Sequence, residues 1–355
     1  MLELSSQTIR LLEDIESRID PEVEEDFERQ WSDFLYDRFD GEIFYPMRKR
    51  TTQPSTEFPR ININDAIGNY DLMIQSELAR VSGALSNGYK NTAIRANYGT
   101  GILTSLFGAE VFMMPYEANT LPTTRSLNDT EQIRDIVEKG MPDLESGFGK
   151  QVFECGEIYA EILQKYPKIS RYLTVYHPDL QGPLDVCELL WGGEMFYAMY
   201  DEPELVHAAL NLVTDTYIAF MERWQKLFKP RSDMNPHWER LWHRGAIVLR
   251  NDSAMNLSPD MYEEFSVPYD SKLLAHFGGG AMHFCGKGDH YIELLSNIKG
   301  LYGVNLSQPQ YNDMERIYRN TVDKGIKLLA FNYDYALKDK ERDGGFHHNL
   351  HSRQS

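Results

Sequence analysis

A histidine and a cysteine stand two positions apart in the segment 281–286, which reads AMHFCG. Successive side chains of an extended strand alternate between its two sides, so His283 and Cys285 point the same way. A neutral imidazole and a thiolate are both good zinc ligands. Two residues alone do not make a zinc site, because at least three protein ligands are needed, and a cysteine is often buried only as a small hydrophobic residue. The pair therefore predicts a zinc site if the fold brings a third ligand to it.

The surrounding pattern places this pair at the end of a strand. Residues 272–277 read as the end of a helix, the three glycines at 278–280 stop it, and residues 286–288 open a turn before the next helical pattern. In (β/α)8 barrels the catalytic residues lie at the carboxyl ends of the strands and in the loops that follow. His283 and Cys285 thus lie where such a barrel carries its chemistry.

Strand-like and helical patterns alternate along most of the chain. Helical spacing separates the runs that read as strands, which are residues 92–98, 172–177, 246–250, 281–285, 301–306 and 327–332. This alternation indicates parallel βαβ units, and about seven or eight of them favour a closed barrel over an open sheet. No Gly-x-Gly-x-x-Gly opens a helix after the first strand, so a dinucleotide-binding fold has no support. We therefore predict an α/β protein with a (β/α)8 (TIM) barrel.

The two ends of the chain depart from this pattern. Residues 1–60 are predicted to form a helical N-terminal extension that ends in an irregular crossing segment, and residues 61–355 to form the barrel. Three histidines near the other end could bind a metal in principle, namely His347, His348 and His351. They lie in a polar, glycine-rich tail, which predicts disorder or a contact between subunits.

Polar residues follow each predicted strand. Any one of them has a simpler explanation as a helix cap, a turn residue or a hydrogen-bonded loop residue. Their coincidence at one end of the predicted barrel indicates a site. In chain order they are Asn97, Tyr98, His177, Asp179, Asn251, Asp252, His283, Cys285, Asn305, Ser307, Asn332, Tyr333 and Asp334.

The segment 236–244, PHWERLWHR, is rich in indole, imidazole and guanidinium groups. A tryptophan offers a flat apolar face, and an arginine can pair with a carboxylate through two parallel N–H groups. Trp238, Arg240, His243 and Arg244 could therefore line the mouth of a pocket for a planar or anionic ligand. Equally, the aromatic residues of this segment could only cover the rim of the barrel.

Composition limits the partners and the compartment. With 36 basic and 54 acidic residues, the chain of 355 residues has a net charge of −18, which repels nucleic acids and anionic membranes. Its three cysteines do not suggest a disulfide framework and fit a reducing cytoplasm. The first residues lack the basic start and apolar core of a signal peptide, and no run of about 18 apolar residues occurs. We predict a soluble, cytoplasmic protein.

Several short motifs, taken in order, resemble the uroporphyrinogen decarboxylase superfamily. This superfamily includes the decarboxylase itself and zinc-dependent methyltransferases, which move methyl groups to or from a corrinoid or a thiol such as coenzyme M. The likeness covers residues 90–335 and implies a single (β/α)8 barrel. Its motifs are DLQGPL at 179–184, YDEPE at 200–204, NDS at 251–253, LSP at 257–259 with EF at 264–265 and PY at 268–269, and HFCG at 283–286.

The decarboxylase branch fits less well than the methyltransferase branch. The decarboxylase has an N-terminal arginine-rich segment that grips the substrate's carboxylates, and an aspartate after an early strand that holds the pyrrole nitrogens. Here the matching positions read RKR at 48–50 and NYGTG at 97–101, with neither the arginine motif nor the acid. The methyltransferases use His-x-Cys and a further cysteine near the last strand.

The resemblance therefore implies an enzyme, a zinc-dependent methyltransferase. His283 and Cys285 match the family's metal ligands, but no cysteine follows them in the sequence. Either Asp252 or Asp334 supplies the third ligand, or the metal has been lost. Asp252, His177 and Asp179 are the predicted catalytic residues. The predicted substrate-binding residues are Asn97, Tyr98, Trp238, Arg240, His243, Asn305 and Tyr333.

The expected cofactor is zinc, and the expected methyl donor or acceptor is a corrinoid carried by a partner protein. Besides a small-molecule substrate, a corrinoid protein and a second copy of the chain are the partners left open. Two rival hypotheses remain. A metal-free decarboxylase or lyase would hold a carboxylated, tetrapyrrole-like substrate with Arg240 and Arg244. A non-catalytic barrel would keep the pocket and bind a small molecule without transforming it. Metal content separates the first hypothesis from the other two, and turnover separates the rivals.

Overall fold

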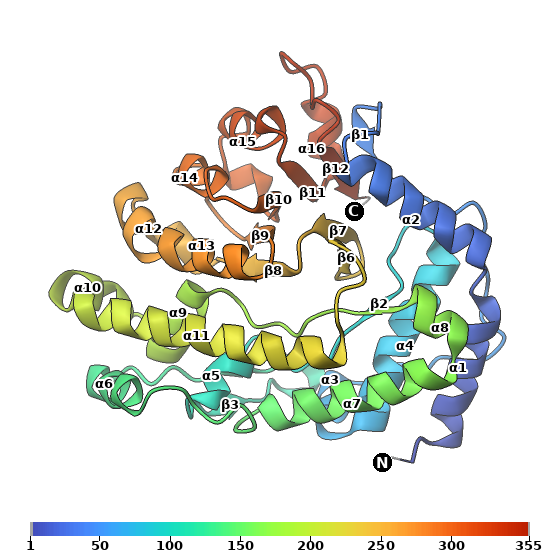
Figure 1. The fold of residues 1–355 in the computed structure, drawn as a ribbon, viewed down its shortest axis with the longest axis horizontal. Coiled ribbons are helices and arrows are strands. Elements are labelled where there is room, and N and C mark those ends of the chain that lie inside the picture. The colour runs from blue at the N-terminus through green and yellow to red at the C-terminus, as the bar shows by residue number, and fades with distance from the viewer. Residues whose placement is uncertain (1–2, 354–355) are drawn as a thin grey trace.

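The computed structural model describes residues 3–353, and its centre is a six-stranded parallel sheet (Figure 1). All neighbouring strands in this sheet run parallel. Across the sheet they follow the order β1 (Ile43–Phe44), β12 (Leu350–Arg353), β11 (Lys327–Asn332), β10 (Leu301–Leu306), β9 (Gly280–Phe284) and β8 (Ile247–Arg250). The α/β class predicted from the alternating pattern is confirmed.

Two further parallel strands, β2 (Ala93–Ile94) and β5 (Thr174–Val175), pair with each other. Within residues 3–353, no ladder of main-chain hydrogen bonds joins β5 to β8. A side chain makes the connection instead, since His177 Nε2 accepts a hydrogen bond of 3.0 Å from the Val248 amide. Gly182 approaches β8 so closely that a Cβ there would lie 2.3 Å from the Arg250 carbonyl oxygen. These strands and the main sheet together are compatible with a (β/α)8 barrel.

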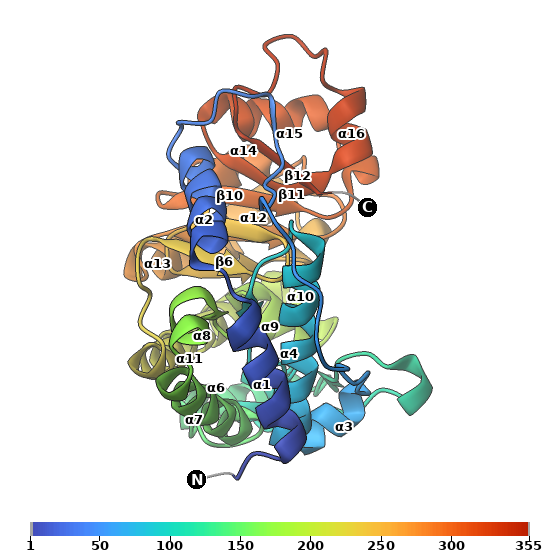
Figure 2. The same ribbon diagram turned by 90° about the vertical axis from the view of Figure 1, so that its right-hand side faces the viewer.

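Helices surround the strands in both views (Figures 1 and 2). They are α1 (Ser6–Arg18), α2 (Pro21–Leu35), α3 (Ile63–Gly68), α4 (Tyr70–Asn87), α5 (Ile102–Leu106), α6 (Thr130–Lys139), α7 (Gly149–Lys165), α8 (Pro167–Tyr172), α9 (Pro183–Trp191), α10 (Glu194–Asp201), α11 (Pro203–Leu227), α12 (Pro259–Phe265), α13 (Val267–His276), α14 (Ile292–Ser296), α15 (Met314–Asn320) and α16 (Tyr333–Lys338). Short 3₁₀ helices are η1 (Tyr116–Ala118), η2 (Ser253–Asn256), η3 (Pro309–Tyr311) and η4 (Val322–Lys324). A small antiparallel pair joins β3 (Val111–Phe112) and β4 (Thr123–Thr124).

The two faces of the main sheet bury different apolar clusters. One face packs on the surrounding helices, and Ile247, Met282 and Leu328 point into that larger cluster. Their neighbours Val248 and Ala281 belong to a second cluster on the opposite face, as the alternation of side chains along a strand requires. The second cluster is completed by α2 and by an antiparallel hairpin, β6 (Met234–His237) and β7 (Leu241–Arg244).

The hairpin β6–β7 contains the segment 236–244, which was predicted to line the mouth of a pocket or to cover the rim of the barrel. It lies in the middle of Figure 1, and β7 contacts β9, β10 and β11. Trp242 of the hairpin stacks on Trp31 of α2 with ring centroids 6.3 Å apart. The aromatic residues of this segment therefore fill the space inside the curved sheet, and the turn at Trp238 carries the chain toward the carboxyl ends of the strands.

The C-terminal segment is ordered, so the prediction of a disordered tail is wrong, while the alternative of a contact between subunits stays a prediction. Strand β12 lies between β11 and β1, and β1 lies in the crossing segment that was predicted to be irregular. His351 is 3% exposed, and its Nδ1 accepts a hydrogen bond of 3.0 Å from the Ala330 amide. Four residues with little β-strand character form a strand here because they pair on both sides.

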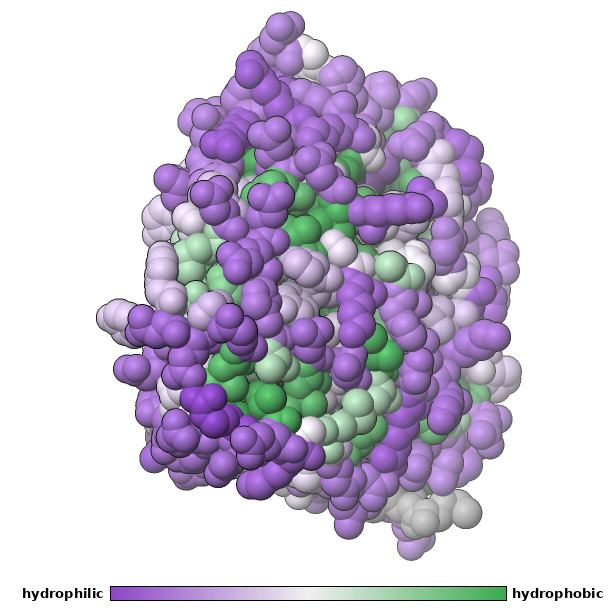
Figure 3. Space-filling view, turned by 60° about the vertical axis from the view of Figure 1, so that its left-hand side comes forward, coloured by the Kyte–Doolittle hydropathy of each residue, from purple (hydrophilic) through white to green (hydrophobic). Residues whose placement is uncertain are grey.

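The N-terminal helices belong to the same core. Leu11, Leu12 and Ile15 of α1 are fully buried, and α1 packs against α4 and α8. Asp20 caps α2 and Pro21 occupies its first position, where the missing amide hydrogen costs nothing. No helix among residues 3–353 is both long and apolar enough to cross a membrane. The face shown in Figure 3 is mostly hydrophilic, with apolar areas between the charged side chains.

Candidate metal centre

Asp252, His283 and Cys285 converge at the carboxyl ends of β8 and β9. One ligand atom from each lies within 4.8 Å of the other two. His283 Nε2 is 3.4 Å from Cys285 Sγ and 3.7 Å from Asp252 Oδ1. The sulfur, nitrogen and oxygen donors are those that zinc accepts, and three protein ligands leave a fourth position for a substrate. The structure thus brings Asp252, and not Asp334, to the predicted pair.

Hydrogen bonds that involve main-chain amides hold Asp252 in place from two directions. Its carboxylate Oδ1 accepts a hydrogen bond of 2.6 Å from the Cys285 amide. The carboxylate of Asp185, at the start of α9, accepts hydrogen bonds of 2.9 Å and 2.8 Å from the amides of Asp252 and Ser253. Asp185 is buried, so these contacts are protected from water. The loop after β8 is therefore anchored before any metal binds.

Asn305, at the end of β10, determines the tautomer of His283. The amide nitrogen of Asn305 donates to the Leu329 carbonyl oxygen at 2.7 Å, which leaves its Oδ1 as the atom facing His283 Nδ1 at 2.6 Å. Because Oδ1 can only accept, Nδ1 must carry the hydrogen. The unprotonated Nε2 then points to Cys285 and Asp252. An outer partner of this kind is typical of metal-binding histidines.

Burial sets the protonation states of the two softer ligands. Burial lowers the pKa of His283, and the positive charge of Arg250 lowers it further against the opposing effect of Asp252. Burial raises the pKa of the Cys285 thiol, and the negative charge of Asp252 raises it further. The imidazole is therefore neutral at pH 7, whereas the thiol must lose a proton before it can bind a metal.

Arg250, which the motifs did not single out, lies beside Asp252, His283 and Cys285, here called the triad. Its guanidinium contacts Asp179 Oδ2 at 2.7 Å and lies 4.7 Å from the ring centroid of Trp238. Arg95 contacts the same carboxylate oxygen at 3.1 Å. Two guanidinium groups thus share the buried carboxylate of Asp179. The position of Arg250 as the last residue of a strand was the signal that could have identified it.

The other two predicted catalytic residues, Asp179 and His177, are buried and are held by hydrogen bonds and ion pairs within the protein. Asp179 is buried between Arg95, Arg250 and Gln181. Both ring nitrogens of His177 are used, since Nδ1 lies 2.7 Å from the Pro178 carbonyl oxygen and Nε2 accepts from Val248. A direct catalytic role of His177 stays a prediction, and it would require one of these hydrogen bonds to break.

The predicted substrate-binding residues fall into two groups. Trp238 lies at the triad, with its ring centroid 5.2 Å from that of His283, and Asn305 contacts His283 directly. Asn97 is buried and accepts a hydrogen bond of 2.9 Å from Arg95 Nε. Tyr98 is fully buried, with no partner for its hydroxyl group among the described residues. The triad's immediate neighbours therefore come from β8, β10 and the hairpin turn.

The remaining predicted residues lie away from the three ligand atoms. Arg240 stacks over Tyr89, and Asp334 is exposed in the first turn of α16 beside Tyr333. His243 and Arg244 are in β7, where Arg244 contacts Asp233 and the rings of Tyr36 and Tyr302. This part of β7 pairs with the beginning of β6, at the opposite end of the hairpin from Trp238.

The overall structure is similar to that of a methyltransferase from Methanosarcina mazei. The similarity extends over 92% of this chain and 92% of that chain, with a TM-score of 0.59 and 17% sequence identity. At this level of identity, the likeness shows a shared fold. No protein-family model and no curated protein matches the sequence.

Proposed function

We propose that this chain is a zinc-dependent methyltransferase of the uroporphyrinogen decarboxylase superfamily, built on a (β/α)8 barrel. The observation that carries the proposal is the convergence of Asp252, His283 and Cys285, with His283 held in the metal-binding tautomer by Asn305. The ordered motifs from residue 179 to residue 286 and the fold shared with a methyltransferase support it.

In this proposal, Asp252, His283 and Cys285 hold zinc, which when bound lowers the pKa of a substrate thiol and keeps it as a thiolate. Cys285 gives up its own proton when the site is loaded. His283 keeps the hydrogen on Nδ1 and donates it to Asn305 Oδ1 throughout, so the imidazole stays oriented with Nε2 toward the metal. The oxygen ligand donates less charge than a second thiolate would, which makes the site more acidic and less tightly binding.

The surrounding residues would bind and shield the substrate. Arg250 has N–H groups beyond the one directed at Asp179, and these suit an anionic part of the substrate. Trp238 packs against both Arg250 and His283 and excludes water from one side of the site. A methyl-corrinoid on a partner protein is the proposed methyl source or acceptor. Asp179 positions Arg250 and thereby acts on the reaction indirectly.

A metal-free carboxy-lyase is the second candidate, and the pair Arg95 and Arg250 favours it. The Arg95 side chain is buried and that of Arg250 is 17% exposed, and beside Asp179 the two guanidinium groups suit a substrate carboxylate. In that case Arg250 would take the role that was predicted for Arg240 and Arg244. Zinc content decides between the two reactions.

The test is a zinc assay on protein purified without chelator, then supplied with excess zinc and desalted. We expect about one zinc per wild-type chain and none in Cys285→Ala, because two remaining ligands bind the metal weakly. Cys187→Ala is the matched control, since Cys187 is buried in α9 away from the triad. Stoichiometric zinc in Cys285→Ala, or none in the wild-type protein, would contradict the proposal. Methyl transfer from methylcobalamin to a thiol by the zinc-loaded protein then tests the reaction.

A further inference from the structure

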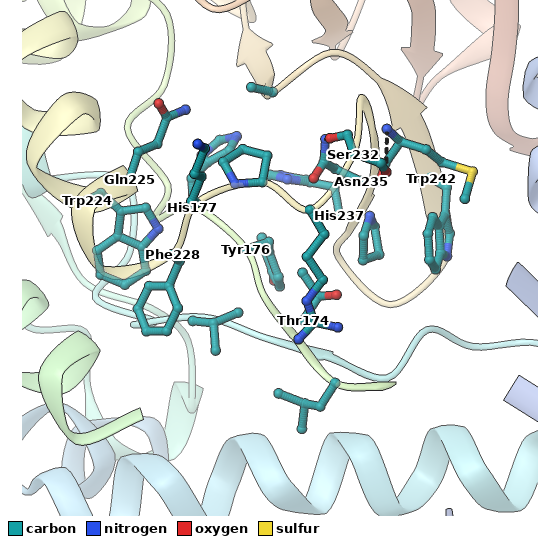
Figure 4. Close-up of a pocket in the computed structure, with 18 of the residues that line it drawn as sticks. Thr174, Tyr176, His177, Trp224, Gln225, Phe228, Ser232, Asn235, His237 and Trp242 are labelled. Atoms are coloured by element: carbon teal, nitrogen blue, oxygen red, sulfur yellow. Dashed lines mark hydrogen bonds between the residues drawn. The ribbon is translucent and has the colours of Figure 1, made fainter. Parts of the chain in front are cut away.

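A cavity lies apart from the candidate metal centre. Its volume is about 500 Å³, and it is bounded by β5, the end of α11 and the hairpin β6–β7 (Figure 4). The described residues that line it include none of the three candidate ligands. A volume of this size suits a small organic molecule.

Aromatic side chains form much of the cavity wall. In Figure 4, Trp224 and Phe228 at the end of α11 lie on one side and Trp242 of the hairpin on the other, with Tyr176 between them. Tyr176, Trp224 and Trp242 are buried, and Phe228 is partly buried. Flat apolar surfaces of this kind favour a planar, aromatic ligand.

His237 presents an unsatisfied polar group in this wall. The residue is 3% exposed, and its Nδ1 has no hydrogen-bond partner among residues 3–353. Burial lowers its pKa far below the usual value, so the imidazole is neutral and needs one acceptor and one donor. Nδ1 of the neighbouring His177 faces the Pro178 carbonyl oxygen, and Nδ1 of His243 that of Arg244. Buried polar atoms rarely stay unpaired, so a ligand hydroxyl group is a suitable partner for His237.

The cavity opens among basic residues. Lys229 and Arg231 are exposed at its edge, and Arg231 donates to the carbonyl oxygens of Ser170 and Arg171, which leaves its charge unmatched by these contacts. Arg171 is paired with Glu28, the one acidic residue of the described lining. In a chain of net charge −18, a local excess of positive charge favours an anionic ligand.

We propose that this cavity binds a planar aromatic carboxylate that carries a hydroxyl group at its far end. The ring lies among Tyr176, Trp224 and Trp242, the hydroxyl group pairs with His237, and the carboxylate faces Lys229 and Arg231. This binding site is additional to the proposed metal centre and does not depend on the methyltransferase reaction.

Calorimetric titration of the full chain with 4-hydroxybenzoate, benzoate and phenol tests the proposal. We expect 4-hydroxybenzoate to bind with a Kd below about 1 mM, and removal of either polar group to weaken binding about tenfold. His237→Phe should lower the affinity for 4-hydroxybenzoate to that for benzoate and leave benzoate binding unchanged. The double variant Lys229→Gln, Arg231→Gln should weaken binding of both carboxylates but not of phenol.

Two controls make the outcome decisive. Lys226→Gln removes a cation from the same helix end outside the cavity lining and should bind like the wild type. Cys285→Ala should also bind like the wild type. If the carboxylate instead bound to zinc at the metal centre, this variant would lose the binding. Equal affinity in the Lys229/Arg231 double variant and Lys226→Gln, no binding of any probe, or binding lost in Cys285→Ala would each overturn the proposal. If His237→Phe does not fold, the double variant of exposed residues still decides.

Discussion

The side-chain amide of Asn305 directs His283 toward a metal. Its nitrogen is committed to the Leu329 carbonyl oxygen, so its oxygen is left to accept the hydrogen of His283 Nδ1. Without this contact, the imidazole could place its hydrogen on Nε2, the atom that faces Asp252 and Cys285. Metal affinity at this site therefore depends on a residue that never touches the metal.

Asn305→Ala is expected to lower zinc affinity by about 10-fold to 100-fold, the usual cost of losing such an outer contact. Asn305→Asp should retain most of the affinity, since a carboxylate oxygen also accepts the Nδ1 hydrogen. Competition with a fluorescent zinc chelator measures both. Equal losses in the two variants would mean that Asn305 acts through packing and not through the tautomer.

The choice between Asp252 and Asp334 gives a second prediction. Asp252→Asn should weaken zinc binding strongly, because it removes the anionic ligand at the triad. Asp334→Asn should leave zinc binding unchanged, because Asp334 is exposed on α16. The two variants remove the same charge and can be compared in one zinc titration. A stronger loss in Asp334→Asn would show that the loop after β11 moves to complete the site.

The sequence predicted His283 and Cys285 as partners because the alternation of a strand is a local property. It could not choose between Asp252 and Asp334, since both follow strands and only the fold decides which strand lies next to β9. Arg250 escaped notice for a similar reason. A charged residue at the end of a strand is common, and only its contact with Asp179 shows that it faces the site.

At the level of elements, a buried polar cluster joins β8 to α12 and α13. Asp270 of α13 is 1% exposed and accepts hydrogen bonds from Asn251 at 3.0 Å and Ser266 at 2.8 Å. Burial raises the pKa of Asp270 to about 7, and the negative charge of Asp185 adds to this. Asn251 directly precedes Asp252 and donates to Asp270, so the charge state of Asp270 affects how firmly the loop after β8 is held.

The raised pKa of Asp270 makes stability depend on pH. In the unfolded chain this carboxyl group ionises near pH 3.8, whereas in the folded protein it stays protonated up to about pH 7. Its stabilising contribution is therefore complete at low pH and is lost as the pH rises toward 7. Asp270→Asn cannot ionise. We expect the unfolding free energy of this variant, relative to the wild type, to rise by up to about 3 kcal/mol between about pH 5 and pH 7. Urea unfolding at both values measures the difference, and a constant difference would refute the assignment.

Strands were predictable in proportion to their apolar content. The runs at β9, β10 and β11 are long and apolar, and the structure has strands there. Strand β1 has two residues, and β12 reads Leu-His-Ser-Arg, so neither carries a local signal. Both form through pairing with strands far away in sequence. The hairpin β6–β7 was likewise hidden, because its aromatic residues suit a binding loop as well as a packed interior.

For the whole molecule, Leu350 shows how the ends of the chain are joined. It is fully buried in β12 and is in register with Leu328 on one side and Ile43 on the other. Leu350→Ala should lower the unfolding free energy by about 2–5 kcal/mol, the range for a fully buried leucine. The matched control is Leu337→Ala, because Leu337 is 47% exposed and should change stability little. Chemical denaturation of both variants gives the comparison, and equal effects would argue against β12 as part of the sheet.

The pairing of β1 with β12 also bears on how the protein is made. During synthesis, Ile43 emerges from the ribosome about 300 residues before its partner Leu350, and contacts so distant in sequence form slowly. Until then, β1 and β11 lack the strand that lies between them, and Trp31 and Phe34 of α2 lack their contact with His351. Unpaired strand edges are prone to aggregation. Nascent chains of this protein should therefore depend on chaperones until residues 350–353 have emerged.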